Sequence, residues 1–313
     1  MVDERIGRFL RFGWLTLGVT LVVIVWGAVV RATGSGAGCG SHWPLCNGEM
    51  VPLAPTIETT IEFVHRITSG GVMLMAVWLL VLARRTFPAR HQVRRWAGIF
   101  LVFMLIEAAI GAGIVLLELV ADNASGLRAA YVGGHLVNTL LLVGAITITL
   151  WHGYHAADGI NGIAEADMFG QSRGLAIALL GMLVVASTGA VVALGDTLFP
   201  HASLAEGLAA DFDPTSHFLI RLRIWHPVVA VMLAGWILWL AWAGPALRHG
   251  SQSRERRLIV WAVLAQSGLG VINLLLLAPL TLQMAHLLVS NLLWIPLVWA
   301  WQTARTAPAP GRR

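Results

Sequence analysis

The sequence predicts an all-α integral membrane protein with eight transmembrane helices. Hydrophobic residues make up 57% of the 313 residues, charged residues only 12%, and the mean hydropathy is +0.75. These values lie outside the range of ordinary soluble domains. Because lipid offers no hydrogen-bond partners to the backbone, runs of roughly 20 apolar residues should cross a membrane as helices. Eight such runs are present, at residues 10–30, 61–83, 96–117, 130–150, 175–194, 220–243, 258–277 and 282–301.

The basic residues predict the orientation of these helices. A formal charge of +5 and a pI near 10.5 would also suit a nucleic-acid-binding protein. However, every basic residue other than histidine is an arginine, and 16 of the 21 arginines fall on one side of the predicted membrane. By the positive-inside rule both termini are cytoplasmic, and we expect no nucleic-acid partner. The basic, then apolar start lacks a convincing signal-peptidase site, so we expect an uncleaved signal anchor.

The two halves of the chain share sequence features. The tetrapeptide Gly-Ala-Val-Val ends the first predicted helix at residues 27–30 and recurs near the end of the fifth at 189–192. Equal spacing relates two pairs in the third and seventh helices, Glu107 with Gly111 and Gln266 with Gly270. We interpret this as a duplication, with independent similarity of apolar helices as the alternative. Since each half has an even number of spans, the halves would form two four-helix bundles related by a pseudo-twofold axis along the membrane normal.

This duplication defines the expected domain boundaries. Residues 1–151 would form the N-terminal bundle, with an outer connection at 31–60. Residues 152–173 would be a cytoplasmic linker, residues 174–303 the C-terminal bundle, and residues 304–313 a disordered tail.

Four histidines occur only in the even-numbered predicted helices, each four to six residues from the start: His65, His135, His226 and His286. With both termini inside, all four lie about 6–9 Å below the outer surface at 1.5 Å per residue. Histidine at this depth is costly and is usually retained for a site. Two histidines on different helices of one bundle could bind a haem iron from opposite faces. We therefore expect two bis-histidine haem sites, although an interhelical hydrogen bond is the alternative for any single histidine.

The other histidines fall in connections or at helix edges, where we expect solvated side chains: His42, His91, His152, His155, His201, His217 and His249. Haem carries two propionates, and arginine is a forked donor suited to carboxylates. Four arginines near the outer ends of the histidine-bearing helices are candidates for this role, with interfacial snorkelling as the alternative: Arg66, Arg128, Arg221 and Arg223.

Two acidic residues stand out in the first half. Glu62 precedes His65 by three residues, so the two share a helix face. The second half has Arg223 in that place, which indicates that one site reacts while the other transfers electrons. A favourable helix-dipole position is an equally good explanation of Glu62. Glu107 lies in mid-span, where we expect a hydrogen bond between helices rather than a proton path, because its counterpart is Gln266.

Cys39 and Cys46 are the only cysteines, and both lie in the glycine-rich first outer connection. On that face a disulfide can persist, and a separation of seven residues permits closure. A zinc site that includes His42 would lack a fourth ligand. A structural bridge and a redox-active dithiol both remain open.

Taken together, these motifs resemble the haem A synthase family over nearly the whole chain. The matching segments are the loop of residues 34–46 that ends Trp-Pro-Leu-Cys, Glu62-Phe63-Val64-His65-Arg66, Gly134-His135-Leu136-Val137-Asn138, and the later His226 and His286. The resemblance implies oxidation of the methyl group of haem O to the formyl group of haem A, through alcohol and gem-diol intermediates and with oxygen from water.

The resemblance also implies residue roles. His65 and His135 would hold the substrate haem with Glu62 near the reacting methyl group, while His226 and His286 would hold haem b. Cys39 and Cys46 match the cysteine-containing bacterial form, in which a disulfide is expected. One departure is Pro227, where the family often has arginine; proline removes a backbone donor and tends to kink a helix.

The resemblance further implies a bacterial inner or plasma membrane, with the haem sites toward the outer face. Expected partners are haem O, membrane lipid, a haem O synthase, an unidentified electron acceptor and a second copy of the chain. Two other functions fit the same four histidines. These are a di-haem electron-transfer cytochrome and a haem transport or assembly protein, and the latter would have no need of Glu62.

Overall fold

The computed structural model describes residues 4–157, 169–243 and 253–306. These residues contain eight spans that are long and apolar enough to cross a membrane, which confirms the predicted all-α fold. The long helices are α1 (Glu4–Ala32), α2 (Ile57–Thr86), α3 (Gln92–Leu116), α4 (Gly126–Ala157), α5 (Phe169–Leu198), α8 (Trp225–Ala243), α9 (Ser253–Leu275) and α10 (Leu280–Thr306). The short elements are η1 (Ser35–Ala37), α6 (Leu204–Phe212) and α7 (Phe218–Arg221), the last of which opens the sixth span.

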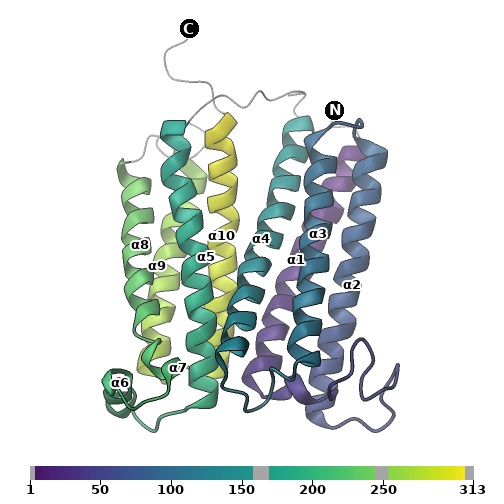
Figure 1. The fold of residues 1–313 in the computed structure, drawn as a ribbon. Helices are drawn as coiled ribbons and strands as arrows, with labels where there is room; N and C mark the ends of the chain where they lie inside the picture. The colour runs from purple at the N-terminus through teal and green to yellow at the C-terminus, as the bar shows by residue number, and fades with distance from the viewer. Residues whose placement is uncertain (1–3, 158–168, 244–252, 307–313) are drawn as a thin grey trace.

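The long helices form two groups of four that stand side by side (Figure 1). In the N-terminal group, α1 to α4 pack in a ring, and in the C-terminal group α5, α8, α9 and α10 do the same. Contacts of α4 with α5 and α10, and of α1 with α10, join the groups. The pseudo-twofold relation between them stays a prediction.

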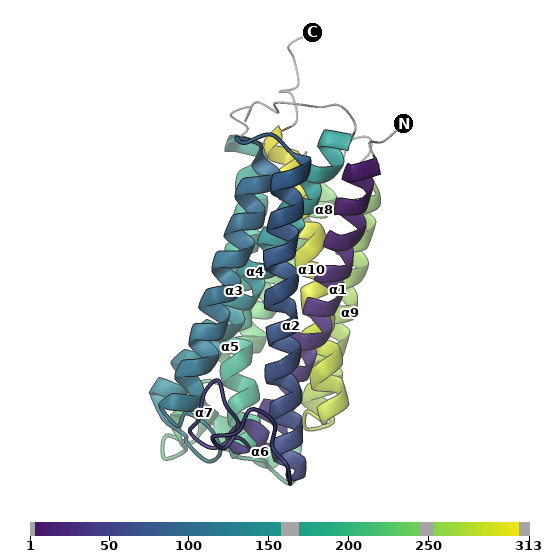
Figure 2. The same cartoon turned by 90° about the vertical axis from the view of Figure 1, so that its right-hand side faces the viewer.

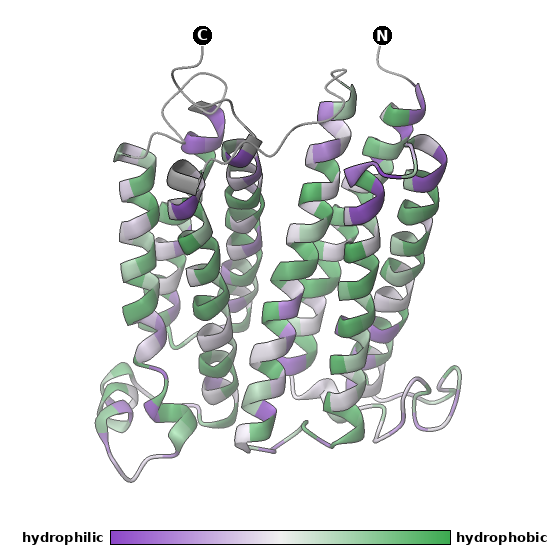
Figure 3. Ribbon diagram, turned by 45° about the horizontal axis from the view of Figure 1, so that its top comes forward, coloured by the Kyte–Doolittle hydropathy of each residue, from purple (hydrophilic) through white to green (hydrophobic). Residues whose placement is uncertain are grey.

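The two ends of the molecule differ. Helix α1 begins and α10 ends at one end, and the connection between α1 and α2 lies at the other, together with α6 and α7 (Figure 1, Figure 2). We call this second end the loop end. Hydrophobic residues line the helices along their length, while hydrophilic residues gather mainly toward both ends (Figure 3).

Helix α4 is the most buried of the spans, since 67% of its apolar window lies inside the protein. It packs against α1, α3, α5 and α10, so it belongs to the core of both groups. The other spans expose large apolar side chains such as Val22, Leu74 and Trp261, as expected for helices that face lipid.

Several helices run past their predicted ends. Helix α4 continues to Ala157, so the first residues of the expected linker are helical, while residues 158–168 lie outside the described part. The expectation of a solvated His152 was wrong, because this side chain is buried with Nε2 3.5 Å from Gln302 Nε2 of α10. Helix α10 ends at Thr306, so a tail could begin only after this residue; residues 307–313 and His249 are also outside the described part.

Pro227 does not interrupt its helix. The sixth span breaks earlier, between the end of α7 at Arg221 and the start of α8 at Trp225. Pro227 is therefore the third residue of α8, and backbone N–H groups in a first helical turn have no intrahelical acceptor. The missing donor costs no helical hydrogen bond, and His226 keeps its place in the first turn.

Candidate functional site

The first histidine pair lies between helices of the N-terminal group. His65 of α2 packs against α1 at Gly27, where an added Cβ would lie 2.9 Å from His65 Cε1. Only glycine allows this close approach. On α4, His135 places Nδ1 3.4 Å from Glu107 Oε1, and the two imidazoles are near enough to interact electrostatically. The Nδ1 atoms of both His65 and His135 are buried without a hydrogen-bond partner among the described residues.

The second pair lies in the C-terminal group. His226 of α8 packs against Gly189 of α5, where an added Cβ would again lie 2.9 Å from the ring. Its Nδ1 lies 3.2 Å from both Val185 O and Thr188 Oγ1 of α5. On α10, His286 has Nε2 3.0 Å from Gln266 Nε2 and a buried, unpartnered Nδ1. The two ring centroids are 6.5 Å apart.

The contacts around the pairs repeat between the two halves. The glycine that opens each Gly-Ala-Val-Val segment touches the first histidine of its own group. Glu107 lies beside the second histidine of one group, and Gln266 lies beside that of the other. Residues that match between the two halves of the sequence therefore also make matching contacts in the structure.

Both pairs suit a haem iron. Two metal–nitrogen bonds of about 2 Å each fit between rings whose centroids are 6.5 Å apart, as in the second pair. Buried polar atoms without partners are uncommon, so the unpaired Nδ1 atoms of His65 and His286 indicate a ligand, while Nδ1 of His135 already faces Glu107. The described residues offer no cluster of three or more His, Cys, Asp or Glu side chains suited to a metal ion. Haem needs only two protein ligands, because its porphyrin supplies the other four.

Glu62 is 3% exposed and already has donors on both oxygens. Its Oε2 accepts from Cys39 N at 2.8 Å, and its Oε1 accepts from Arg66 Nη2 at 2.5 Å and Nε at 3.1 Å. The carboxylate therefore joins helix α2 to the first connection, three residues along the chain from His65. Its position is fixed by these three hydrogen bonds.

A disulfide joins Cys39 to Cys46, as the cysteine-containing resemblance implied, so neither sulfur is available as a zinc thiolate. Thr59 and Arg66 dock this loop on α2. Thr59 Oγ1 donates to Gly38 O at 2.7 Å, and Arg66 Nη1 donates to the carbonyls of His42 and Leu45 at 2.7 and 2.6 Å. The loop thus lies against the start of α2, on the side that carries Glu62.

The four arginines proposed as propionate partners differ in their present contacts. Arg66 is paired with Glu62, and Arg223 is paired with Asp196 at 3.0 Å and Asp211 at 2.7 Å. Arg221 makes one long contact, 3.5 Å from Pro214 O.

Arg128 stands apart from the other three. It is 5% exposed and donates from Nη1 to the main-chain carbonyls of Ala121 and Asn123, while its Nε is buried without a partner in the part of the chain that the structure describes. Among the four arginines, Arg128 is therefore the one that has a buried donor still without a partner among the described residues.

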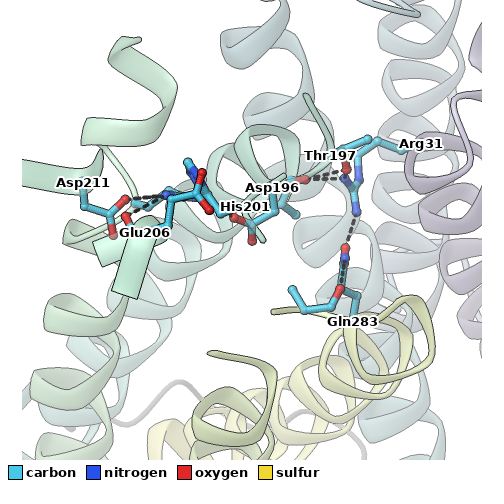
Figure 4. Close-up of polar contacts among 11 residues, drawn as sticks. Arg31, Asp196, Thr197, His201, Glu206, Asp211 and Gln283 are labelled. Atoms are coloured by element: carbon cyan, nitrogen blue, oxygen red, sulfur yellow. Dashed lines mark hydrogen bonds and ion pairs between the residues drawn. The ribbon is translucent and has the colours of Figure 1, made fainter. Parts of the chain in front are cut away.

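Arg31 was not among the residues predicted from the sequence. Its side chain reaches from the N-terminal helix group to the C-terminal one (Figure 4). From the last turn of α1 its Nη1 donates to Ala193 O and Thr197 Oγ1 of α5, each at 2.6 Å. Its Nη2 donates to Gln283 Oε1 of α10 at 2.8 Å. The sequence does contain a signal that singles out Arg31. Arginine directly follows the first Gly-Ala-Val-Val segment, whereas alanine follows the second.

Comparison with known proteins identifies the family. A Thermus thermophilus protein named Protoheme IX farnesyltransferase is 41% identical over 296 residues, which cover 93% of this chain and 48% of that protein. The chain thus spans about half the length of this relative. Two proteins named Heme A synthase are similar along most of their length. The protein of Exiguobacterium sibiricum is 29% identical over 250 residues (79% of this chain, 78% of that protein), and the protein of Bacillus mycoides is 27% identical over 307 residues (93% and 92%). Residues 10–298 match the COX15-CtaA family model, described as cytochrome oxidase assembly protein, and the chain belongs to this family.

Proposed function

We propose that this chain is a haem A synthase, which oxidises the methyl group of haem O to a formyl group. The main support is the presence of two half-buried histidine pairs, one in each helix group, which contain buried imidazole nitrogens without a partner among the described residues. Similarity over nearly the full length to proteins named Heme A synthase points the same way. This function would contribute to cytochrome oxidase assembly, in keeping with the family description.

The two pairs would have different roles. His65 and His135 would hold the substrate haem O, because Glu62 and the disulfide loop lie on the helix that carries His65. His226 and His286 would hold a resident haem b, which supplies one-electron transfer when bound. Arg128 is the best supported of the four predicted propionate partners. Arg66, Arg221 and Arg223 stay candidates with weaker support, since two of them already pair with carboxylates.

The proposed chemistry consumes water and releases electrons. Oxidation of the methyl group with capture of one water gives an alcohol, two protons and two electrons. A second oxidation of the same kind gives a gem-diol, which loses water to form the aldehyde. An electron acceptor not yet identified would take the four electrons. Glu62 would orient the attacking water or accept its proton, since a carboxylate held by three donors has a fixed direction.

We further propose a bacterial inner or plasma membrane, with both termini cytoplasmic and the loop end outward. The arginine distribution supports this orientation. A haem O synthase is the proposed source of substrate, and the farnesyltransferase name of the longer Thermus relative is consistent with such a partner. Membrane lipid and a second copy of this chain are the other proposed partners.

A di-haem electron-transfer cytochrome is the second candidate. The observation in its favour is that the neighbours of Glu62 already occupy both carboxylate oxygens, as a purely structural residue would require. Extraction and mass analysis of the haems in the purified chain separate the two functions. A synthase yields haem O, its alcohol or haem A, whereas a cytochrome yields only unmodified haem.

Glu62→Gln tests the role of the carboxylate directly. We expect this variant to lose haem A while it retains haem b. The matched control is Glu58→Gln, which alters an exposed acid one turn earlier on the same helix and should leave haem A unchanged. Wild-type haem A levels in Glu62→Gln would remove Glu62 from the mechanism.

A further inference from the structure

Glu107 is held firmly beside a proposed haem ligand. It lies within the apolar span α3, where its Oε1 accepts from Thr139 Oγ1 and its Oε2 accepts from Asn138 Nδ2, both at 2.5 Å. Both donors are on α4, three and four residues after His135. This arrangement brings Oε1 to 3.4 Å from the unpartnered Nδ1 of His135, so a small movement would complete a hydrogen bond.

The second half has an amide in the same place. Gln266 Nε2 of α9 lies 3.0 Å from His286 Nε2, and an exchange of the amide N and O would turn the carbonyl oxygen toward this ring nitrogen as an acceptor. Gly270, one turn later on α9, also approaches that ring. Gln266 Oε1 is buried without a partner among the described residues. One histidine of each pair therefore has a different neighbour, a carboxyl group in the first half and a carboxamide in the second.

This difference should matter once iron is bound. A histidine ligand commonly donates its second ring N–H to a carboxylate or a carbonyl, which fixes the ring and raises the basicity of the ligand. A carboxylate acceptor makes the stronger, charge-assisted hydrogen bond. A more basic ligand stabilises ferric over ferrous iron, and second-shell hydrogen bonds are among the established controls of haem potential.

We propose that Glu107 and Gln266 are positioning residues that give the two haem sites different reduction potentials, with the site of His135 the lower of the two. The inference rests on the proposed function, since it requires a haem at each pair. It extends that function by assigning a direction of electron transfer between the two sites. Electrons removed at the first site would pass downhill to the second.

A structural explanation of Glu107 is also available, because its bonds to Asn138 and Thr139 join α3 to α4. This role alone would change stability on substitution but would leave the relative affinity for ferric and ferrous haem unchanged. The midpoint potential of each haem therefore separates the two explanations.

The test uses the full purified chain with both haems and a spectroelectrochemical titration. We expect Glu107→Gln to raise one midpoint potential and Gln266→Glu to lower the other. A tenfold change in the ferric-to-ferrous preference corresponds to a shift of about 59 mV for one electron. Glu118→Gln, at an exposed acid just beyond α3, is the matched control and should shift neither potential.

The outcomes are distinct. If Glu107→Gln keeps both haems and both potentials, the inference is wrong while the proposed function stands. If Glu107→Gln loses haem, the test passes to Gln266→Glu. A lowered midpoint potential of the haem held by His226 and His286 then supports the inference, and an unchanged potential overturns it. If the wild-type chain binds no haem through these histidines, the proposed function fails and the inference fails with it.

Discussion

Gly27→Ala should disturb the first histidine pair without harming helix α1 itself. An alanine Cβ would lie 2.9 Å from His65 Cε1 and 3.2 Å from Nε2. Since carbon atoms pack best at about 3.5–4.0 Å, the imidazole would have to move by about 0.6 Å or more. Alanine favours a helix over glycine by about 1 kcal/mol, so the propensity effect alone would stabilise the protein. Any loss must therefore come from the contact with the ring.

The assay is the amount and identity of bound haem per purified chain, with the absorption spectrum of each haem. We expect Gly27→Ala to lower retention of the haem of the first pair by about 10–100-fold, the range seen when ligand orientation is disturbed. The haem of the second pair should be retained. Gly189→Ala should give the converse result, because its Cβ would meet His226 at the same 2.9 Å.

Gly18→Ala is the control for this experiment. Gly18 lies on the same helix as Gly27, and an added Cβ there meets nothing within 4 Å. It should keep both haems. The reasoning is refuted if Gly27→Ala and Gly18→Ala bind the same haems with the same spectra, since the glycine would then have no part in holding His65.

Two further predictions concern the loop end. Arg31→Met should lower the free energy of unfolding by about 1.5–3 kcal/mol, a fall in Tm of several degrees, because it removes charged hydrogen bonds to α5 and α10. Arg11→Met, at an exposed arginine of the same helix, is the control, and equal Tm values for the two variants would contradict a role for Arg31 between the helix groups. The double variant Cys39→Ser/Cys46→Ser should be cleaved faster by protease within residues 33–56, since a short disulfide loop contributes about 2–3 kcal/mol. Cleavage at the wild-type rate would mean that the contacts of Thr59 and Arg66 hold the loop without the disulfide.

The spans and the histidine pairing could be predicted because they depend on local patterns. Apolar run length determines the helices, and their alternating direction predicts that the four histidines lie at one depth. The N-cap that begins α6 was also visible, since Ser203 Oγ accepts from Glu206 N; Glu206 Oε2 in turn accepts from Ala202 N, the residue before the cap. This helix was missed because its nine residues are too few for a membrane span.

Tertiary contacts could not be predicted in the same way. His152 looked solvated in the sequence because it falls just past the predicted end of the fourth span, but α4 continues and packs it against α10. Arg223 suited a propionate by position alone, yet Asp196 and Asp211 approach it from other segments. The hydrogen bond from Cys39 N to Glu62 likewise joins residues 23 positions apart. Only the folded chain reveals which of the candidate cations and anions are already paired.

A duplication of one four-helix unit would explain why the two halves share their histidine contacts and could still carry out different chemistry. The glycines and histidines of the two halves make the same contacts, and the two halves differ in the residues next to them. The clearest departure is Arg31, which follows the first Gly-Ala-Val-Val segment and donates to the carbonyl of Ala193, the residue that follows the second. An arginine at both positions would bring two guanidinium groups together in a partly buried place, at an electrostatic cost. The small side chain of Ala193 leaves its carbonyl open to Arg31, so the difference between the two segments at this position adds a hydrogen bond between helix groups that α4 and α10 already hold together.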